Sequence, residues 1–131
     1  MIDHLSTYAK DFAATRAFYA AVFGVLGYEI QADMKLTDDV DLPGRKICAW
    51  GPPGRAVFWV IESKDATQPR HLAFTASDRA TVDRFHSVGL AAGGSDHGAP
   101  GLRATYHADY YGSFLLDPDG NNVEAVCHTP A

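Results

Sequence analysis

Two histidines and one glutamate are the residues of this chain whose types and spacing best suit metal chemistry. His4 and His71 each lie in the first strand-like stretch of a repeated unit, and each is followed directly by a leucine. Glu124 stands in another such stretch, between Val123 and Ala125. A carboxylate among apolar neighbours is costly to bury unless it meets a cation. Because divalent ions favour imidazole and carboxylate ligands, we expect His4, His71 and Glu124 to hold a divalent metal ion.

Each of these residues also has a simpler interpretation. A histidine in a strand can be a hydrogen-bonded residue at the rim of a core, and Glu124 can pair with an arginine such as Arg103 or Arg16. The metal site is favoured because the two histidines occupy the same position in a repeated unit, and because Glu124 needs a partner.

The repeat has an offset of 67 residues: His4-Leu5 falls on His71-Leu72, Asp11 on Asp78, Phe18 on Phe85 and Gly27 on Gly94. Two copies of one supersecondary unit are therefore joined in tandem. A half of about 60 residues is near the lower limit for an independent core. We therefore expect a single domain over 1–131 with one shared core, in which module one covers 1–62, a linker 63–69 and module two 70–128.

Hydrophobic periodicity predicts the same order of elements in both copies, namely a strand, a helix and three further strands. In the first copy we expect strands at 2–8, 28–32, 46–50 and 55–61, and a helix that Asp11 caps and Gly24 and Gly27 end. In the second copy we expect strands at 71–75, 103–106, 112–116 and 122–128, and a helix from Asp78 to about 92. The segment 95–102, rich in glycine and proline, is expected to be a mobile surface loop near the mouth of a site.

Alternation along the strands predicts the direction of the two histidines. His4 shares a strand face with Ser6, and His71 shares one with Ala73. The opposite, apolar face of each sheet should pack on the helix of its module, so the histidines should turn inward on a concave surface and approach each other. The sequence therefore predicts an α+β fold of two tandem βαβββ modules with the helices outside.

Composition excludes several classes of function. The formal net charge is −5, and the eleven Lys and Arg residues are scattered singly, so we expect no nucleic-acid partner. No segment approaches the roughly 18 apolar residues of a membrane span, and the first residues lack a secretion signal, so we expect no membrane partner and a cytoplasmic location. Cys48 and Cys127 lie in apparent strands without a paired spacing, which indicates buried packing groups.

The Asp-His-Leu opening, the duplicated unit and the close Asp-Pro-Asp-Gly-Asn-Asn-Val-Glu at 117–124 resemble the vicinal oxygen chelate superfamily of glyoxalase I, bleomycin-resistance proteins and extradiol dioxygenases. The resemblance implies that each module curves its mixed sheet into a half barrel. It matches His4, His71 and Glu124 to metal ligands. Counting from the turns puts Phe58 at the fourth ligand position, and a shift of one puts Trp59 there; neither side chain binds a metal.

Two histidines and one glutamate are similar to the facial triad of extradiol dioxygenases, which leaves open positions on Fe(II) or Mn(II); Zn and Ni are the other ions we consider. The resemblance and the residues favour a metal-dependent enzyme acting on a small oxygen-chelating substrate, either a glyoxalase-like lyase or isomerase or a ring-cleaving dioxygenase. His107 is the expected general acid-base. Phe114 stands where the dioxygenases have a tyrosine, and Tyr110 is the expected source of a phenol.

A metal-free binding protein similar to the bleomycin-resistance branch is the alternative. Its cleft would bind an aromatic or cationic small molecule, and the residues expected to line the pocket are Phe58, Trp59, Tyr106, Tyr111 and Arg103. A domain with neither ion nor ligand is a third possibility. Members of the superfamily often form dimers, so we expect a homodimer, with the cavity built from one chain or from two.

Overall fold

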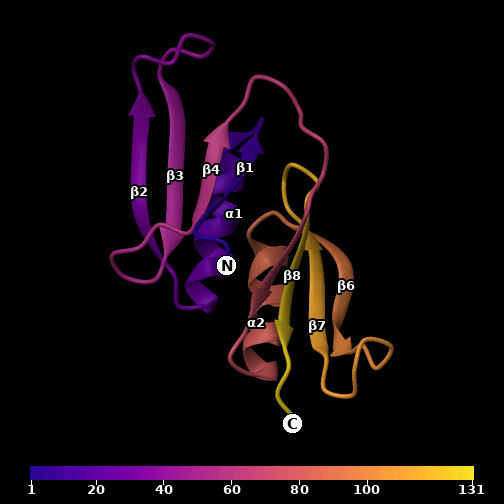
Figure 1. Ribbon diagram of the computed structural model, residues 1–131. Helices are drawn as coiled ribbons and strands as arrows, with labels where there is room; N and C mark the ends of the chain where they lie inside the picture. Colours follow the sequence, from indigo (N-terminus) through magenta and orange to yellow (C-terminus); the bar gives the residue numbers. More distant parts are fainter.

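The computed structural model describes all residues from 1 to 131, and it consists of two units with the same order of elements (Figure 1). The first unit contains β1 (Leu5–Ala9), α1 (Phe12–Val25), β2 (Glu29–Leu36), β3 (Arg45–Gly51) and β4 (Phe58–Glu62). The second contains β5 (His71–Thr75), α2 (Arg79–Ala91), β6 (Ser95–Leu102), β7 (Tyr111–Leu116) and β8 (Asn122–Cys127). The predicted α+β fold with two βαβββ units is confirmed.

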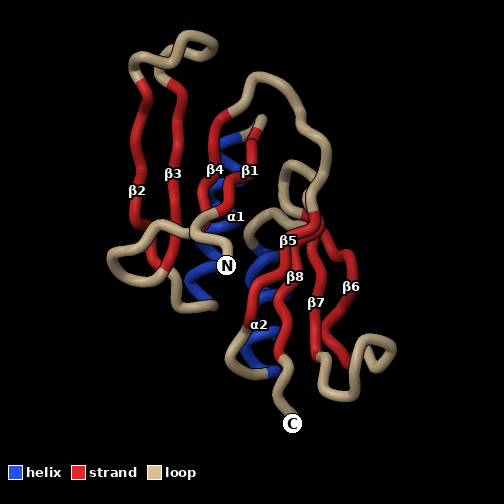
Figure 2. The backbone as a smooth tube through the Cα atoms, in the orientation of Figure 1, coloured by secondary structure: helices blue, strands red, loops and turns tan.

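Both units fold into an open four-stranded mixed sheet with the same topology. The strand orders are β1-β4-β3-β2 and β5-β8-β7-β6, and in each sheet the first strand of the unit pairs in parallel with the last. Figure 2 shows the two sheets side by side, with both helices behind them. Each sheet therefore has a face that packs on its helix and a second face that no helix covers, which we call the open face.

The helices begin where the sequence predicts. The Asp11 side chain accepts a hydrogen bond from the Ala14 backbone N–H, and Asp78 caps α2 in the same way through Thr81. These bonds satisfy backbone donors that a helix N-terminus otherwise leaves free. Both predicted helix starts follow from the repeated aspartate.

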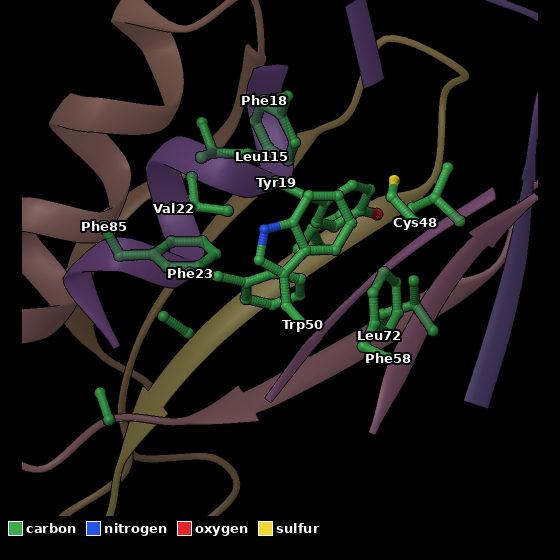
Figure 3. Packing of buried hydrophobic residues seen from close by; sticks show 14 of the residues in the cluster. Phe18, Tyr19, Val22, Phe23, Cys48, Trp50, Phe58, Leu72, Phe85 and Leu115 are labelled. Carbon is green, nitrogen blue, oxygen red and sulfur yellow. The ribbon is translucent and has the colours of Figure 1, made fainter. Parts of the chain in front are cut away.

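One hydrophobic core joins the two units, as the short length of each half predicts. Its 18 buried residues come from both helices and both sheets. Figure 3 shows how most of them pack. Across the boundary, the ring of Phe74 on β5 meets those of Phe23 and Phe58 edge-on, with centroids 5.0 and 5.5 Å apart. Such aromatic contacts add to the burial of area. The two cysteines, Cys48 and Cys127, are buried and free.

The last turn of the second unit is hydrogen-bonded to the first unit. The buried Asp117 carboxylate accepts hydrogen bonds from the Tyr19 hydroxyl on α1 at 2.7 Å and from the Asn121 side-chain amide at 2.8 Å. Asp119, two residues on, accepts from the Lys10 backbone N–H at 2.9 Å and from the Thr15 hydroxyl. The aspartates of the 117–124 motif therefore hold the turn against the first unit.

The segment 95–102 differs from its prediction. It forms the edge strand β6, whereas 103–106, predicted as a strand, lies in a turn. The pairing of β6 with β7 is irregular, with register shifts between Asp96 and Gly98 and between Gly98 and Gly101. A strand at the edge of a sheet is hydrogen-bonded to another strand on one side only. It therefore tolerates glycine, proline and irregular pairing. Neither helix of the molecule is long and apolar enough to cross a bilayer.

The contact between Tyr19 and Asp117 predicts a measurable loss of stability. Tyr19→Phe should lower the free energy of unfolding by about 1–3 kcal/mol, because the buried Asp117 Oδ2 loses one of its two donors and keeps only the Asn121 side-chain amide. Urea denaturation followed by circular dichroism measures the change. Tyr8→Phe is the control, since the Tyr8 side chain is partly exposed on the open face of the first sheet. Equal midpoints for the two variants would contradict the structural role of the Tyr19 hydroxyl.

Candidate functional site

Glu124 lies in the middle of the open face of the second sheet. Its neighbours in register are Ala73 on β5 and Phe114 on β7, and His71 is opposite Asn122 one step along. Although Glu124 is on the face without a helix, it is only 2% exposed. The side chains around it therefore remove it from water, and its carboxylate needs polar partners.

The first partner is His71. Its Nε2 lies 3.2 Å from Glu124 Oε2. Two atoms that each bind one ion at about 2.1 Å are about 3.0–3.4 Å apart for right-angle to tetrahedral geometry. The distance is that of a direct contact between imidazole and carboxylate, and it also equals the spacing of two neighbouring ligands of one ion. Half of the His71 side chain is exposed to solvent.

The second partner is Tyr110, whose hydroxyl donates to Glu124 Oε1 at 2.5 Å. Burial, followed by the hydrogen bond and charge of Glu124, raises the pKa of Tyr110 to about 12. The phenol is therefore protonated near neutral pH. Gly112 leaves room for this arrangement, because a Cβ at that position would lie 3.0 Å from Glu124 Oε1.

The simpler explanation of Glu124, an ion pair with an arginine, does not describe this site. Arg16 pairs with Asp33 on β2, and Arg103 bonds to backbone carbonyls of Ala99 and Leu102. The partners that the structure gives Glu124 are therefore a histidine and a phenol.

His107 pairs with a residue that the sequence did not single out. The His107 Nε2 lies 2.8 Å from His128 Nδ1, and the Asp109 backbone N–H donates to His107 Nδ1 at 3.2 Å. In neutral His107 the proton must therefore be on Nε2, which donates to His128. Both rings meet the Tyr110 ring edge-on. The available sequence signal for His128 was strand alternation, which puts it on the face of Glu124.

His4 lies on the open face of the other sheet. Its Nδ1 contacts the Asp3 carboxylate at 2.7 Å, and it lines a pocket of about 430 Å³ with Tyr8, Trp59 and Ile61. The chain contains no group of three or more His, Cys, Asp or Glu side chains placed to hold a metal ion. The structure therefore brings His71 and Glu124 together and places His4 elsewhere.

Strand register decides which residue of the first unit corresponds to Glu124. Trp59 pairs with Ser6 as Glu124 pairs with Ala73, and Ser6 and Ala73 are equivalent under the repeat. Trp59 faces the pocket, whereas Phe58 points the other way and is buried in the core against Tyr19. Trp59, and not Phe58, therefore corresponds to Glu124. The alignment of the turns that paired Phe58 with Glu124 does not account for one additional residue in the turn before β4.

The remaining expected pocket residues lie at different places around the second sheet. The Tyr111 hydroxyl donates to Asp83 of α2 at 2.8 Å, so Tyr111 is on the helix-covered side. Tyr106 is 66% exposed and packs on Tyr110. The Arg103 guanidinium lies over the Phe114 ring on the open face, 5.5 Å from its centroid. The polar groups of this open face thus include His71, Asn122, Glu124, Tyr110, His128 and Arg103.

Comparison with known proteins agrees with this fold. A model of the Glyoxalase/Bleomycin resistance protein/Dioxygenase superfamily matches residues 1–125. No curated protein matches the sequence. A glyoxalase/bleomycin resistance protein from Albidiferax ferrireducens is 24% identical with a TM-score of 0.75, and the alignment covers 98% of this chain and 99% of that one.

Two further solved structures share the fold at lower identity. A fosfomycin resistance protein from Listeria monocytogenes, complexed with Mn(II) and dihydroxypropylphosphonic acid, is 17% identical with a TM-score of 0.67 over 96% of this chain and 90% of that one. A glyoxalase I mutant from Zea mays is 18% identical with a TM-score of 0.70 over 95% of this chain and 43% of that one. With a family match over nearly its whole length, the chain belongs to the glyoxalase/bleomycin resistance protein/dioxygenase superfamily.

Proposed function

We propose that this chain is a divalent-metal-dependent enzyme that acts on a small oxygen-chelating substrate, as a glyoxalase-like lyase or isomerase or as a ring-cleaving dioxygenase. The observation that carries the proposal is the distance of 3.2 Å between His71 Nε2 and Glu124 Oε2 on the open face. A buried carboxylate beside a half-exposed imidazole is a ligand pair that suits Fe(II), Mn(II), Zn or Ni. The relative from Listeria monocytogenes that contains Mn(II) adds support at the level of the family.

The third ligand in this proposal is His4 of a second copy of the chain. His4 and His71 hold equivalent positions on two sheets that lie side by side (Figure 2). A second copy that places its first sheet over the second sheet of its partner would bring the two histidines together. The first sheet has exposed apolar side chains on its open face, Tyr8, Met34 and Leu36. Burial of such side chains against another molecule is favourable, so we propose a homodimer.

The ion would be held by His4, His71 and Glu124, and when bound it would act as a Lewis acid on substrate oxygens. The Tyr110 hydroxyl fixes the orientation of the Glu124 carboxylate by its hydrogen bond to Oε1. His107, held in one tautomer by Asp109 and His128, is the proposed acid-base group at the rim of the open face. An imidazole ring can accept and donate a proton, which an acid-base group at this place requires.

Binding of an aromatic small molecule without a metal is the second candidate function. It is favoured by the pocket of about 430 Å³ on the first sheet, in which the Trp59 side chain stands where a fourth ligand would be. Apolar and aromatic walls with a few polar groups are typical of small-molecule sites. Trp59, with Tyr8 and Ile61 beside it, could stack on a planar ring.

Metal content tests the first candidate. The purified protein is equilibrated with each of the four ions, dialysed and subjected to elemental analysis. We expect about one ion per chain, and a loss of at least tenfold in affinity in His71→Ala and in Glu124→Gln, because each removes one ligand. His97→Ala, an exposed histidine of β6, is the control and should retain the ion. No binding of any ion by the wild-type protein would contradict the proposal.

Mixing two variants tests whether each site takes residues from two copies. His4→Ala and His71→Ala chains should each bind little metal alone. A mixed dimer of the two contains one site with both substitutions and one site with neither, so mixing with exchange of chains should restore metal binding to about half of the sites in mixed dimers. Sedimentation velocity establishes the dimer. If mixing restores no metal while both variants remain folded dimers, the site does not combine residues of two chains.

Removal of Trp59 tests the second candidate. Trp59→Ala should weaken binding of 1-naphthol by about tenfold, because stacking and ring burial on one wall are lost. Tyr106→Ala, which truncates an exposed ring of the second unit, is the matched control. Fluorescence titration of chelator-treated protein measures both affinities. Equal affinity of wild type and Trp59→Ala would show that the first sheet is not an aromatic site.

A further inference from the structure

We propose that Arg103 binds an oxyanion of the substrate, a carboxylate or a phosphate, on the open face of the second sheet. The inference rests on the proposed function, since it assumes that this open face is the substrate site. It adds the chemical class of the substrate, which would have an anionic group in addition to its chelating oxygens. The observations that support it are the missing partner of Arg103, its fixed orientation and its neighbours.

Arg103 differs from the other arginines in its partners. Four of the seven arginines lie within 4.0 Å of a carboxylate. Of the remaining three, Arg70 and Arg84 are exposed, and only Arg103 is partly buried. A partly buried arginine without an acidic partner has no opposite charge nearby, and desolvation penalises such a charge. An anionic ligand would supply that charge.

The guanidinium is also held in place before any ligand binds. Its Nη2 donates to the Ala99 carbonyl at 2.7 Å, its Nη1 makes a longer bond of 3.5 Å to the Leu102 carbonyl, and its Cζ lies over the Phe114 ring, 5.5 Å from the centroid. A guanidinium has five N–H donors, so several remain free for a ligand. A planar cation fixed in this way recognises carboxylate and phosphate oxygens in pairs and loses little entropy on binding.

The neighbours place Arg103 beside the proposed ligand pair. Phe114 is opposite Glu124 in the register of β7 and β8, and its ring lies nearly parallel to that of His71, with centroids 6.4 Å apart. Arg103 and His71 therefore both contact or approach one phenylalanine ring on the open face. A substrate with its chelating oxygens toward His71 and its anionic end at Arg103 would therefore lie along this phenylalanine ring.

Binding of inorganic phosphate to chelator-treated protein tests the proposal, because no metal is then present to hold the anion. The 31P line width of phosphate is measured during titration with the protein. We expect Arg103→Ala to weaken phosphate binding by at least about tenfold and Arg103→Lys to weaken it less, since lysine keeps the charge and loses the planar fork. Arg84→Ala, which removes an exposed arginine of α2, is the control and should bind like the wild type.

Competition with malonate identifies the source of the anion. If malonate displaces phosphate at concentrations below the dissociation constant of phosphate, the site prefers carboxylates. If higher malonate concentrations are needed, the site prefers phosphates. Both results support the proposal. Equal phosphate affinity of Arg103→Ala and wild type, or no affinity of the wild type, would overturn it. Elemental analysis of Arg103→Ala separates the two proposals, because this variant should still bind the divalent ion.

Discussion

The arrangement of the two units depends on the hydrogen bonds that the buried Asp117 carboxylate accepts. It receives the Tyr19 hydroxyl from α1 and the Asn121 side chain from its own turn, and the backbone N–H groups of Asp119 and Asn121 also donate to it. This turn leads directly into β8, so the same contacts that join the units also determine where Glu124 enters the second sheet. The motif at 117–124 thus contains both the aspartates that join the two units and Glu124 of the candidate site.

The two open faces have the same backbone and different chemistry. At equivalent positions, the first sheet has Trp59 beside a largely apolar pocket, and the second has Glu124 with His71 and Tyr110. Duplication supplied two copies of one scaffold, and the differences between the copies indicate separate tasks. Under the proposed functions, the first sheet contacts a ring or another sheet, and the second contacts an ion and a polar substrate.

Much of the fold could be predicted because the repeat, the helix caps and the strand alternation all indicate the same architecture. The positions of His71 and Glu124 on one face also follow from alternation and the parallel pairing of β5 with β8. The assignment of Phe58 or Trp59 could not be made, because one additional residue in a turn reverses every face that follows. The distance between His4 and His71 could not be predicted either, since it depends on how two sheets pack and not on any local pattern.

The strand β6 also could not be predicted, because glycine and proline in its sequence are typical of loops. Its position at the edge explains why these residues are tolerated, and it has a consequence for association. The irregular ladder and Pro100 make this edge a poor template for an additional strand. The opposite outer edge, β2, has eight residues, a single irregularity and exposed Ile30, Met34 and Leu36. Uncontrolled strand addition, the first step of aggregation, should therefore start at β2 and not at β6.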